Sequence, residues 1–352
     1  GYTTLSYNAG SPSYEFYERN AYIRNPPNPE LRWEKVKTIN FGTDFSLLNN
    51  RISGALDYYV KYTSDLLTPN TLDPTTGVNS LIMNVANTKT NGLDLRLNTL
   101  NTSGKLQWKT TFLYSFNKNI VTKYLLRRTN SSNYISSGVT PEEGYSVFPT
   151  FSYRFAGLDP ENGDPIGYFE GGESKDYSKL IINTPVTELK YHGSSRPLIF
   201  GTLRNDFTIK DFSLSFNLGF YFKYFFRRPS FSSAALIGGE GHDDYYKRWQ
   251  KKGDEQQTIV PSFQYPANSY RDQFYLMSEA VVEPGDHIRL EDIRLSYIIP
   301  KIDRLKVGLI NLSLYANNLG IIWRKNKLSL DPQNPYSVSA PRSIALGLNV
   351  KF

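Results

Sequence analysis

The stretch FSLSFNLGFYFKYFF, residues 212–226, decides the fold class of this chain, because its side chains alternate in polarity over its whole length. Apolar or aromatic side chains occupy the even positions, and mostly polar or small ones occupy the odd positions from Ser213 to Lys223. A period of two is typical of a β-strand with one dry and one wet face. At roughly 3.3 Å per residue this strand would reach about 50 Å, whereas strands of soluble sheets usually have about 5–6 residues.

The composition excludes several classes of protein. With 352 residues, 39% of them apolar and 14% aromatic, the chain is too apolar to be disordered. No window approaches 18 uninterrupted apolar residues, which excludes a transmembrane helix but not membrane-spanning strands, since these hide half their residues from lipid. The net charge of +7 is spread along the chain, so a solvated basic surface is favoured over nucleic-acid binding. The absence of cysteine excludes a disulfide scaffold and cysteine-ligated metal.

The same alternation recurs along the chain and predicts nine strands. Turn-forming residues join them in pairs, for example Asn49-Asn50 and Lys210-Asp211. Between Leu290 and Ile293 the apolar phase shifts by one residue, which predicts a β-bulge. The predicted strands are residues 39–47, 52–62, 93–98, 106–117, 198–209, 212–226, 287–300, 306–320 and 343–352.

The connections between these strands alternate in length. Two to six residues join the strands of each pair at one end, while the other end carries residues 1–32 and long loops at about 64–90, 123–197, 229–286 and 321–341. Short turns on one side and long loops on the other are typical of outer-membrane barrels, with the long loops extracellular. We therefore expect the even face of 212–226 to contact lipid, with Tyr224 and Phe226 near the extracellular aromatic girdle, and the odd face to line a wet interior.

The predicted fold class is all-β, a transmembrane antiparallel β-barrel. Nine strands cannot close a bacterial barrel, which has an even number and no unpaired edge in lipid. The chain is thus expected to be one incomplete domain, residues 1–352, supplying about nine C-terminal strands of a barrel of about 22 strands whose plug lies outside this chain. It opens without Met, a basic n-region or an apolar h-region, which also favours a fragment.

The last strand ends in an alternating pattern of its own. Counting back from the aromatic Phe352, the apolar positions resemble the signal by which outer-membrane barrels are recognised for assembly. These positions are Val350, Leu348, Leu346 and Ile344. By spacing alone they are one more amphipathic strand.

Seven ordered blocks resemble the C-terminal half of the barrel of SusC/RagA-like TonB-dependent transporters from Bacteroidetes. They include VANTKTNGLDLRL (85–97), FAGLDPENGDPIGY (155–168), GDHIRLEDIRLSYIIP (285–300) and LYANNLGIIWRKNKLSLDPQ (314–333). The resemblance implies an outer-membrane importer of oligosaccharides or peptides, energised through TonB, with a SusD-like surface lipoprotein as a lid. The plug and the TonB box are not in this chain, so the remaining barrel and plug, in the same or a separate polypeptide, are expected partners.

Candidate chemistry is sparse. His242-Asp243-Asp244 sits in a Gly-rich segment without a second ligand cluster, so a solvated loop is favoured over a metal site. Asp159, Glu161, Asn162 and Asp164 carry calcium-type oxygens but lack EF-hand spacing, so a turn is favoured over a calcium site and no cofactor is expected. No Ser/His/Asp arrangement, phosphate-binding loop or carboxylate pair stands out, so no enzyme is predicted.

Ligand binding is a better-supported prediction than catalysis. Rigid aromatic rings in the loops could stack on sugar faces or peptide side chains, although packing among the loops or against the lid is favoured for each ring. The candidate residues are Tyr14, Phe16, Tyr17, Tyr22, Tyr245, Tyr246 and Trp249. Three functions remain open: an active nutrient transporter, a ferric-chelate receptor of the same barrel class, and a non-membrane glycan-binding β-protein.

Overall fold

The computed structural model describes residues 4–8, 20–73, 75, 78, 80–126, 131–136, 141–299 and 308–351. Its main feature is a nine-stranded antiparallel sheet in the order β18-β17-β16-β13-β12-β6-β5-β4-β3, in which each strand pairs with the next of the nine along the chain. The strands are β3 (Lys35–Leu47), β4 (Ile52–Thr71), β5 (Ser80–Ser103), β6 (Leu106–Tyr124), β12 (Ile199–Ile209), β13 (Phe212–Phe222), β16 (His287–Ile299), β17 (Leu309–Arg324) and β18 (Ser343–Lys351). The nine predicted strands and their antiparallel pairing are confirmed.

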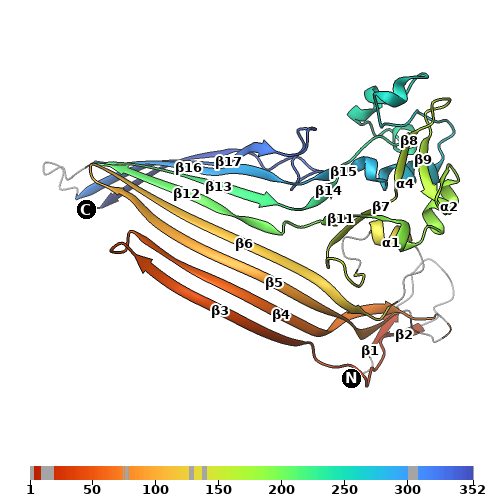
Figure 1. The fold of residues 1–352 in the computed structure, drawn as a ribbon, viewed down its shortest axis with the longest axis horizontal. Helices are drawn as coiled ribbons and strands as arrows, with labels where there is room; N and C mark the ends of the chain where they lie inside the picture. Colours follow the sequence, from red (N-terminus) through yellow and green to blue (C-terminus); the bar gives the residue numbers. More distant parts are fainter. Residues whose placement is uncertain are drawn as a thin grey trace.

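Short turns lie at one end of this sheet and long connections at the other (Figure 1). Leu48, Asn49 and Asn50 turn the chain between β3 and β4 with φ of 53°, 53° and 64°. Asparagine tolerates this left-handed region better than most residues, which is why the Asn pair marks the turn. Lys210, with φ of 51°, opens the turn between β12 and β13. The C-terminus lies at this turn end (Figure 1).

The long connections fold into a compact module at the loop end of the sheet (Figure 1). We call residues 131–136, 141–194 and 225–284 the loop module. It contains α1 (Ser131–Ser136), β7 (Pro149–Ser152), β8 (Phe155–Leu158), β9 (Pro165–Phe169), β10 (Gly172–Ser174), α2 (Tyr177–Ile182), β11 (Lys190–Ser194), β14 (Phe225–Arg227), α3 (Ser233–Ile237), α4 (Ser269–Leu276) and β15 (Val282–Pro284). Another hairpin, β1 (Thr4–Asn8) with β2 (Asn20–Asn25), also lies at the loop end (Figure 1).

The main cluster of buried hydrophobic residues lies in the loop module. Phe151, Tyr153 and Leu180 are at most 2% exposed, and Phe274 of α4 is fully buried among them. Gly167 permits this packing, since a Cβ there would lie 2.6 Å from the Phe274 ring. The connections are therefore structured by their own apolar contacts, as in any small globular unit.

The apolar face of the sheet is exposed. Paired residues form continuous apolar rows, of which one runs Trp108, Phe207, Leu214, Leu295, Leu314, Leu346 across six strands. Phe41 is 69% exposed, Phe212 54% and Leu346 80%. A soluble sheet would bury such rows against a second layer, because each large side chain contributes roughly 1.5–3 kcal/mol when removed from water.

The opposite face of the sheet is polar. Arg204 donates from Nε to Asp206 Oδ1 at 3.2 Å and from Nη2 to Ser215 Oγ at 3.1 Å. The pairs Asp206–Lys109 and Asn217–Asp292 lie on the same face. The expected division of β13 into an apolar even face and a polar odd face is thus confirmed for residues 212–222.

The strand predicted at residues 212–226 ends earlier in the structure. β13 ends at Phe222, because Lys223 has φ of 61° and breaks the extended backbone. Tyr224 and Phe226 are only 4% and 7% exposed: Tyr224 packs against His287 of β16, and Phe226 lies in β14 of the loop module, so the prediction that they lie at a lipid-facing girdle is wrong. Gly285 allows the close packing, since a Cβ there would lie 2.4 Å from the Tyr224 ring.

Two further differences concern strand boundaries. Most of the predicted loop 64–90 is strand, because β4 continues to Thr71 and pairs with β5 from Ser80 onward. The predicted bulge is confirmed: Asn217 pairs with Asp292 and Leu218 with Leu290, leaving Glu291 as the extra residue. No helix among the described residues is long and apolar enough to cross a membrane.

Candidate functional site

A recess of about 480 Å³ opens in the loop module beside the segment 244–260, where the sequence predicted aromatic ligand contacts. Its lining combines Tyr246 with charged and amide side chains, including Arg228, Arg248, Gln250 and Glu283. We call this the module recess. A mixture of one exposed ring with several hydrogen-bonding groups suits a hydroxyl-rich or amide-rich ligand.

The floor of the module recess is held by a buried ion pair. Arg228 and Asp244, whose side chains are 5% and 8% exposed, form a close salt bridge. Ser230 Oγ donates to Asp244 Oδ2 at 2.6 Å, and Lys247 Nζ donates to Asp244 Oδ1 at 3.2 Å. Burial opposes ionisation of Asp244, but these hydrogen bonds and the Arg228 charge hold its pKa below the ordinary value.

The carboxyl group of Glu283, also in the lining of the module recess, has a weaker contact with a positive charge than Asp244 has. Glu283 Oε1 lies 4.0 Å from Arg228 Nε, a buried atom that has no hydrogen-bond partner within the described structure. Burial raises the pKa of Glu283, and the Arg228 charge opposes that rise. Arg228 Nε is therefore a buried donor whose nearest charged neighbour is Glu283.

The sequence predicted that residues 242–244 form a solvated loop, and this prediction is wrong for Asp244, whose side chain is 8% exposed. His242 Nδ1 accepts from Asp244 N at 3.1 Å and so caps the 3-10 turn over residues 243–247. Asp244 is turned inward by this cap and meets Arg228. Among the described residues no group of three or more His, Cys, Asp or Glu side chains is placed to hold a metal ion.

The predicted aromatic residues divide into one accessible ring and two packed rings. Tyr246 is 80% exposed at the module recess. The ring centroid of Tyr245 lies 5.5 Å from that of Phe231 and 3.9 Å from the Arg248 guanidinium. Trp249 Nε1 donates to Glu255 Oε2 at 3.2 Å, and its ring occupies the space beside Gly163. Packing among the loops thus fits Tyr245 and Trp249, whereas Tyr246 contacts the Tyr245 ring at 5.7 Å and otherwise stays exposed.

Four predicted ligand residues cannot be placed. Tyr14, Phe16 and Tyr17 lie outside the described residues, and Tyr22 is described only through its backbone in β2, where it pairs with Ser6. Their ligand role stays a prediction.

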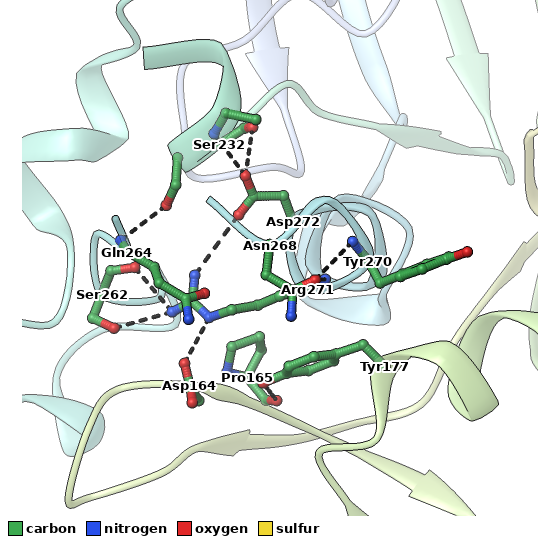
Figure 2. Close-up of polar contacts among 12 residues, drawn as sticks. Asp164, Pro165, Tyr177, Ser232, Ser262, Gln264, Asn268, Tyr270, Arg271 and Asp272 are labelled. Atoms are coloured by element: carbon green, nitrogen blue, oxygen red, sulfur yellow. Dashed lines mark hydrogen bonds and ion pairs between the residues drawn. The ribbon is translucent and has the colours of Figure 1, made fainter. Parts of the chain in front are cut away.

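A buried arginine network holds the loop module together (Figure 2). Arg271 of α4 is 1% exposed; its Nε donates to Asp164 Oδ1 at 2.6 Å, and its Nη2 donates to Ser262 O at 2.9 Å. Neighbouring Asp272 accepts from Ser232 Oγ at 3.0 Å and from Ala234 N at 2.8 Å. These contacts join the β8–β9 turn, α3 and α4.

The calcium-type oxygens of LDPENGDP take part in this network or in local turns. Asp164 binds Arg271, while Asp159 forms a close ion pair with Lys175. Asn162 Oδ1 accepts from Asp164 N at 3.0 Å, as in an Asx turn. The Lys175 and Glu161 hydrogen bonds lower the pKa of Asp159. The segment therefore acts as a turn that positions Asp164 for Arg271.

A second recess, of about 410 Å³, lies at the loop end of the polar face and was missed by the sequence analysis. We call it the wall recess. Its lining includes Phe200, Tyr221, Asn117, Asn119 and Arg196. Tyr221 stacks on His287 at 4.9 Å, and the Arg196 guanidinium lies 3.8 Å from the Phe148 ring centroid. The alternation of the strands contains a signal for this recess. Tyr221 and Phe200 are aromatic residues that pair with each other at positions of the polar face.

The fold and its two faces define part of the wall of an outer-membrane β-barrel. No protein-family model matches this chain. It is 27% identical over 398 residues to TonB-dependent receptor P26 of Formosa agariphila, covering 94% of this chain and 36% of that protein. It is 25% identical over 248 residues to TonB-dependent receptor SusC of Bacteroides thetaiotaomicron, covering 62% of this chain and 24% of SusC.

Solved structures show the same fold. A structure of the RagAB peptide transporter superposes with a TM-score of 0.69 at 20% identity, over 92% of this chain and 35% of the other. TonB-dependent receptors, which are outer-membrane proteins, are thus homologues of this chain, and its sheet corresponds to a part of their barrel. The chain spans about a third of the length of the curated relatives it matches first. These homologues are receptors and transporters and not enzymes.

Proposed function

We propose that this chain supplies part of the wall and extracellular loops of an active outer-membrane transporter that imports oligosaccharides or peptides. The observation that carries the proposal is the two-faced sheet: one face exposes apolar rows suited to lipid, and the other carries polar groups and the wall recess next to the loop module. In this arrangement the loop end is extracellular. Energy would come through TonB acting on a plug, and a SusD-like surface lipoprotein would cover the loops.

The proposal favours organic nutrients because of the chemistry of the two recesses. An exposed Tyr246 beside arginine and amide groups, and the rings of Phe200 and Tyr221, provide stacking surfaces with nearby hydrogen-bonding groups. Sugar rings and peptide side chains use both kinds of contact. A ferric-chelate receptor is the alternative within the same class of barrel; a non-membrane glycan-binding protein does not agree with the outer-membrane homologues.

Uptake by cells that carry the complete gene tests the transport proposal. We expect labelled oligosaccharides or peptides to accumulate, and accumulation to stop when the proton-motive force is collapsed, since TonB-driven import needs that energy. Uptake of a ferric chelate instead, with expression induced by iron limitation, would support the alternative receptor. Uptake that continues without the proton-motive force would contradict the proposal.

Replacing Tyr246 by alanine tests the module recess. In the purified full-length transporter we expect Tyr246→Ala to raise the Kd for the transported ligand by up to about tenfold, because an aromatic contact contributes roughly 0.5–1.5 kcal/mol. Calorimetric titration measures the change. Tyr270→Ala is the matched control, since Tyr270 is 45% exposed on α4 but does not line the recess. Equal affinities for the two variants would remove Tyr246 from the ligand site.

A further inference from the structure

Arg196 is the one charged side chain in the lining of the wall recess, as far as the structure describes that lining. It is half-buried and forms no ion pair within the described part of the chain. A guanidinium without a carboxylate partner keeps its charge and its donors for a ligand. The recess therefore offers a positive charge on the polar face of the sheet, together with the rings of Phe200 and Tyr221.

Local contacts hold the Arg196 guanidinium in place. It lies 3.8 Å from the Phe148 ring centroid, and the Arg196 backbone N donates to Ser194 Oγ at 3.0 Å. Stacking on an aromatic face leaves the edge of the planar guanidinium free for a bidentate pair with a carboxylate. A fork that is already oriented loses little side-chain entropy when such a pair forms.

Polar atoms beside Arg196 suit the neutral part of such a ligand. Asn119 Oδ1 in the lining is buried and has no hydrogen-bond partner among the described residues, so it can accept from a ligand hydroxyl or N–H. The Tyr221 hydroxyl donates to the carboxylate of Glu291, which lies outside the lining. Glu291 repels a second carboxylate near the Tyr221 ring, so the anionic group of a ligand is directed to Arg196.

The wall recess continues into a second cavity of about 420 Å³. The lining residues that the two have in common are Asn119, Ser146, Ser194 and Leu198. Three lysines line the second cavity, Lys118, Lys223 and Lys325, against one carboxylate, that of Asp286. Asp286 is already engaged, since its Oδ1 accepts from Lys223 N at 2.7 Å and its Oδ2 lies 3.6 Å from Lys325 Nζ. This excess of positive charge favours a ligand with more than one anionic group.

We propose that Arg196 selects substrates that carry carboxylates, and that the transported molecule is an oligomer in which carboxylates repeat. One carboxylate would form the bidentate pair with Arg196 while a neighbouring unit stacks on Phe200 or Tyr221. The next carboxylate would lie near the lysines of the second cavity. Uronate oligosaccharides and acidic peptides share this chemistry. The inference rests on the proposed function, because it names the substrate class of the same transporter.

The test measures which molecules the purified full-length transporter retains from one mixture of uronate oligosaccharides, neutral oligosaccharides, acidic peptides and neutral peptides. Mass spectrometry identifies the retained molecules, and their class, sugar or peptide, gives the source of the carboxylate. We expect carboxylated molecules to be enriched, and the enrichment to fall about tenfold for Arg196→Gln, because a charge-assisted pair is lost. Methyl esterification of the mixture should cause a similar fall for the unsubstituted protein.

Arg154→Gln is the matched control for the loss of a stacked guanidinium. Arg154 lies 4.7 Å from the Tyr168 ring centroid but lines neither cavity, so we expect this variant to keep the enrichment. Arg196→Lys keeps the charge and loses the planar fork, so its enrichment should fall less than that of Arg196→Gln. If Arg196→Gln fails to assemble, Arg196→Lys is compared with Arg154→Lys.

Two results would overturn the inference. The first is equal enrichment in the Arg196 and Arg154 variants, and the second is a retained pool, including an empty one, in which carboxylated molecules are not enriched. Import of neutral oligosaccharides alone, driven by the proton-motive force, would also contradict the inference and would leave the transport proposal intact. Retention of carboxylated molecules without any uptake would contradict the transport proposal and leave the role of Arg196 intact.

Discussion

Arg271 is the clearest case of a residue whose role depends on burial. It is 1% exposed and bridges Asp164 to the carbonyl and hydroxyl of Ser262 (Figure 2). Removing one partner of a buried pair leaves the other charge without compensation, and this costs more than the pair itself contributes. The loop module is therefore held by a few such groups as well as by its apolar core.

We expect Arg271→Met to destabilise the loop module by about 3–5 kcal/mol, because the buried Asp272 and the partly buried Asp164 would lose their guanidinium partner. Limited proteolysis of the full-length protein measures the effect as faster cleavage within residues 155–276. Lys252→Met is the control, since Lys252 and Glu161 form an ion pair whose side chains are 71% and 73% exposed. Exposed pairs contribute about 0–1 kcal/mol. Equal cleavage rates would contradict the structural role of Arg271.

His192 of β11 makes the loop module sensitive to acid. Burial, followed by the charge of Lys190, lowers the pKa of His192 from 6.5 to about 4. Its Nε2 lies 2.8 Å from Ser152 Oγ. The folded protein therefore keeps the imidazole neutral at pH values where the unfolded chain binds a proton.

The sign of this effect is a loss of stability in acid. The contribution of neutral His192 is complete above a pH of about 6.5 and falls as the pH decreases toward about 4. We expect proteolysis of the loop module to accelerate between about pH 7 and about pH 5, and His192→Gln to weaken that dependence. A pH profile unchanged by the substitution would assign the acid sensitivity to another group.

At the scale of the element, β13 shows how alternation sets the environment of each side chain. Leu218 lies on the apolar face between the rows of Phe212 and Phe222, whereas Asn217 next to it lies on the polar face. Two neighbouring residues of this strand therefore face different environments, one lipid and the other water. Glu291 in the facing strand adds one residue as a bulge, and the apolar phase of β16 continues beyond it.

We expect Leu218→Arg to cost roughly 2–4 kcal/mol of barrel stability, because an arginine at the midplane of the bilayer must leave water. Asn217→Arg, the matched control, should cost much less, since its side chain reaches the wet interior. Unfolding of the full-length protein in lipid vesicles by denaturant measures both values. Similar costs at the two positions would argue against lipid on the even face.

At the scale of the whole molecule, β18 provides one edge of the sheet. Leu346 and Leu348 pair with Leu314 and Leu312 of β17 and are 80% and 65% exposed. Together with Ile344 they lie on the apolar face, as the predicted assembly signal requires; Val350 pairs with Ile310, and Phe352 is outside the described residues. The role of these residues in assembly stays a prediction.

We expect Leu348→Asp in the full-length protein to reduce its amount in the outer membrane several-fold, because a charge on the apolar face opposes both recognition and insertion. Asn349→Asp, one position along, is the control on the opposite face. Quantification of the protein in outer-membrane fractions measures the result. Equal amounts of the two variants would show that this strand carries no face-specific signal.

The sequence by itself determined the sheet. The period of two is visible in the residues themselves, so local patterns predicted the nine strands and their pairing. They also predicted the bulge between Leu290 and Ile293 and the difference in connection length between the two ends of the sheet. The same phase marks Tyr221 as a ring on the wet face, although its partner His287 is 66 residues away and only the fold brings the two together.

Only the tertiary structure decided the loop module and the recesses. Asp164 and Arg271 are 107 residues apart, and no periodicity links them, because irregular segments are fixed by contacts between distant parts of the chain. The same reason explains why Tyr224 and Phe226, which continue the alternation, are buried and not exposed on the apolar face. The extended backbone of β13 ends before Lys223, and Tyr224 then packs against His287 while Phe226 lies in the loop module. Local alternation therefore specifies a strand, whereas long-range packing specifies where the strand ends and what the loops can bind.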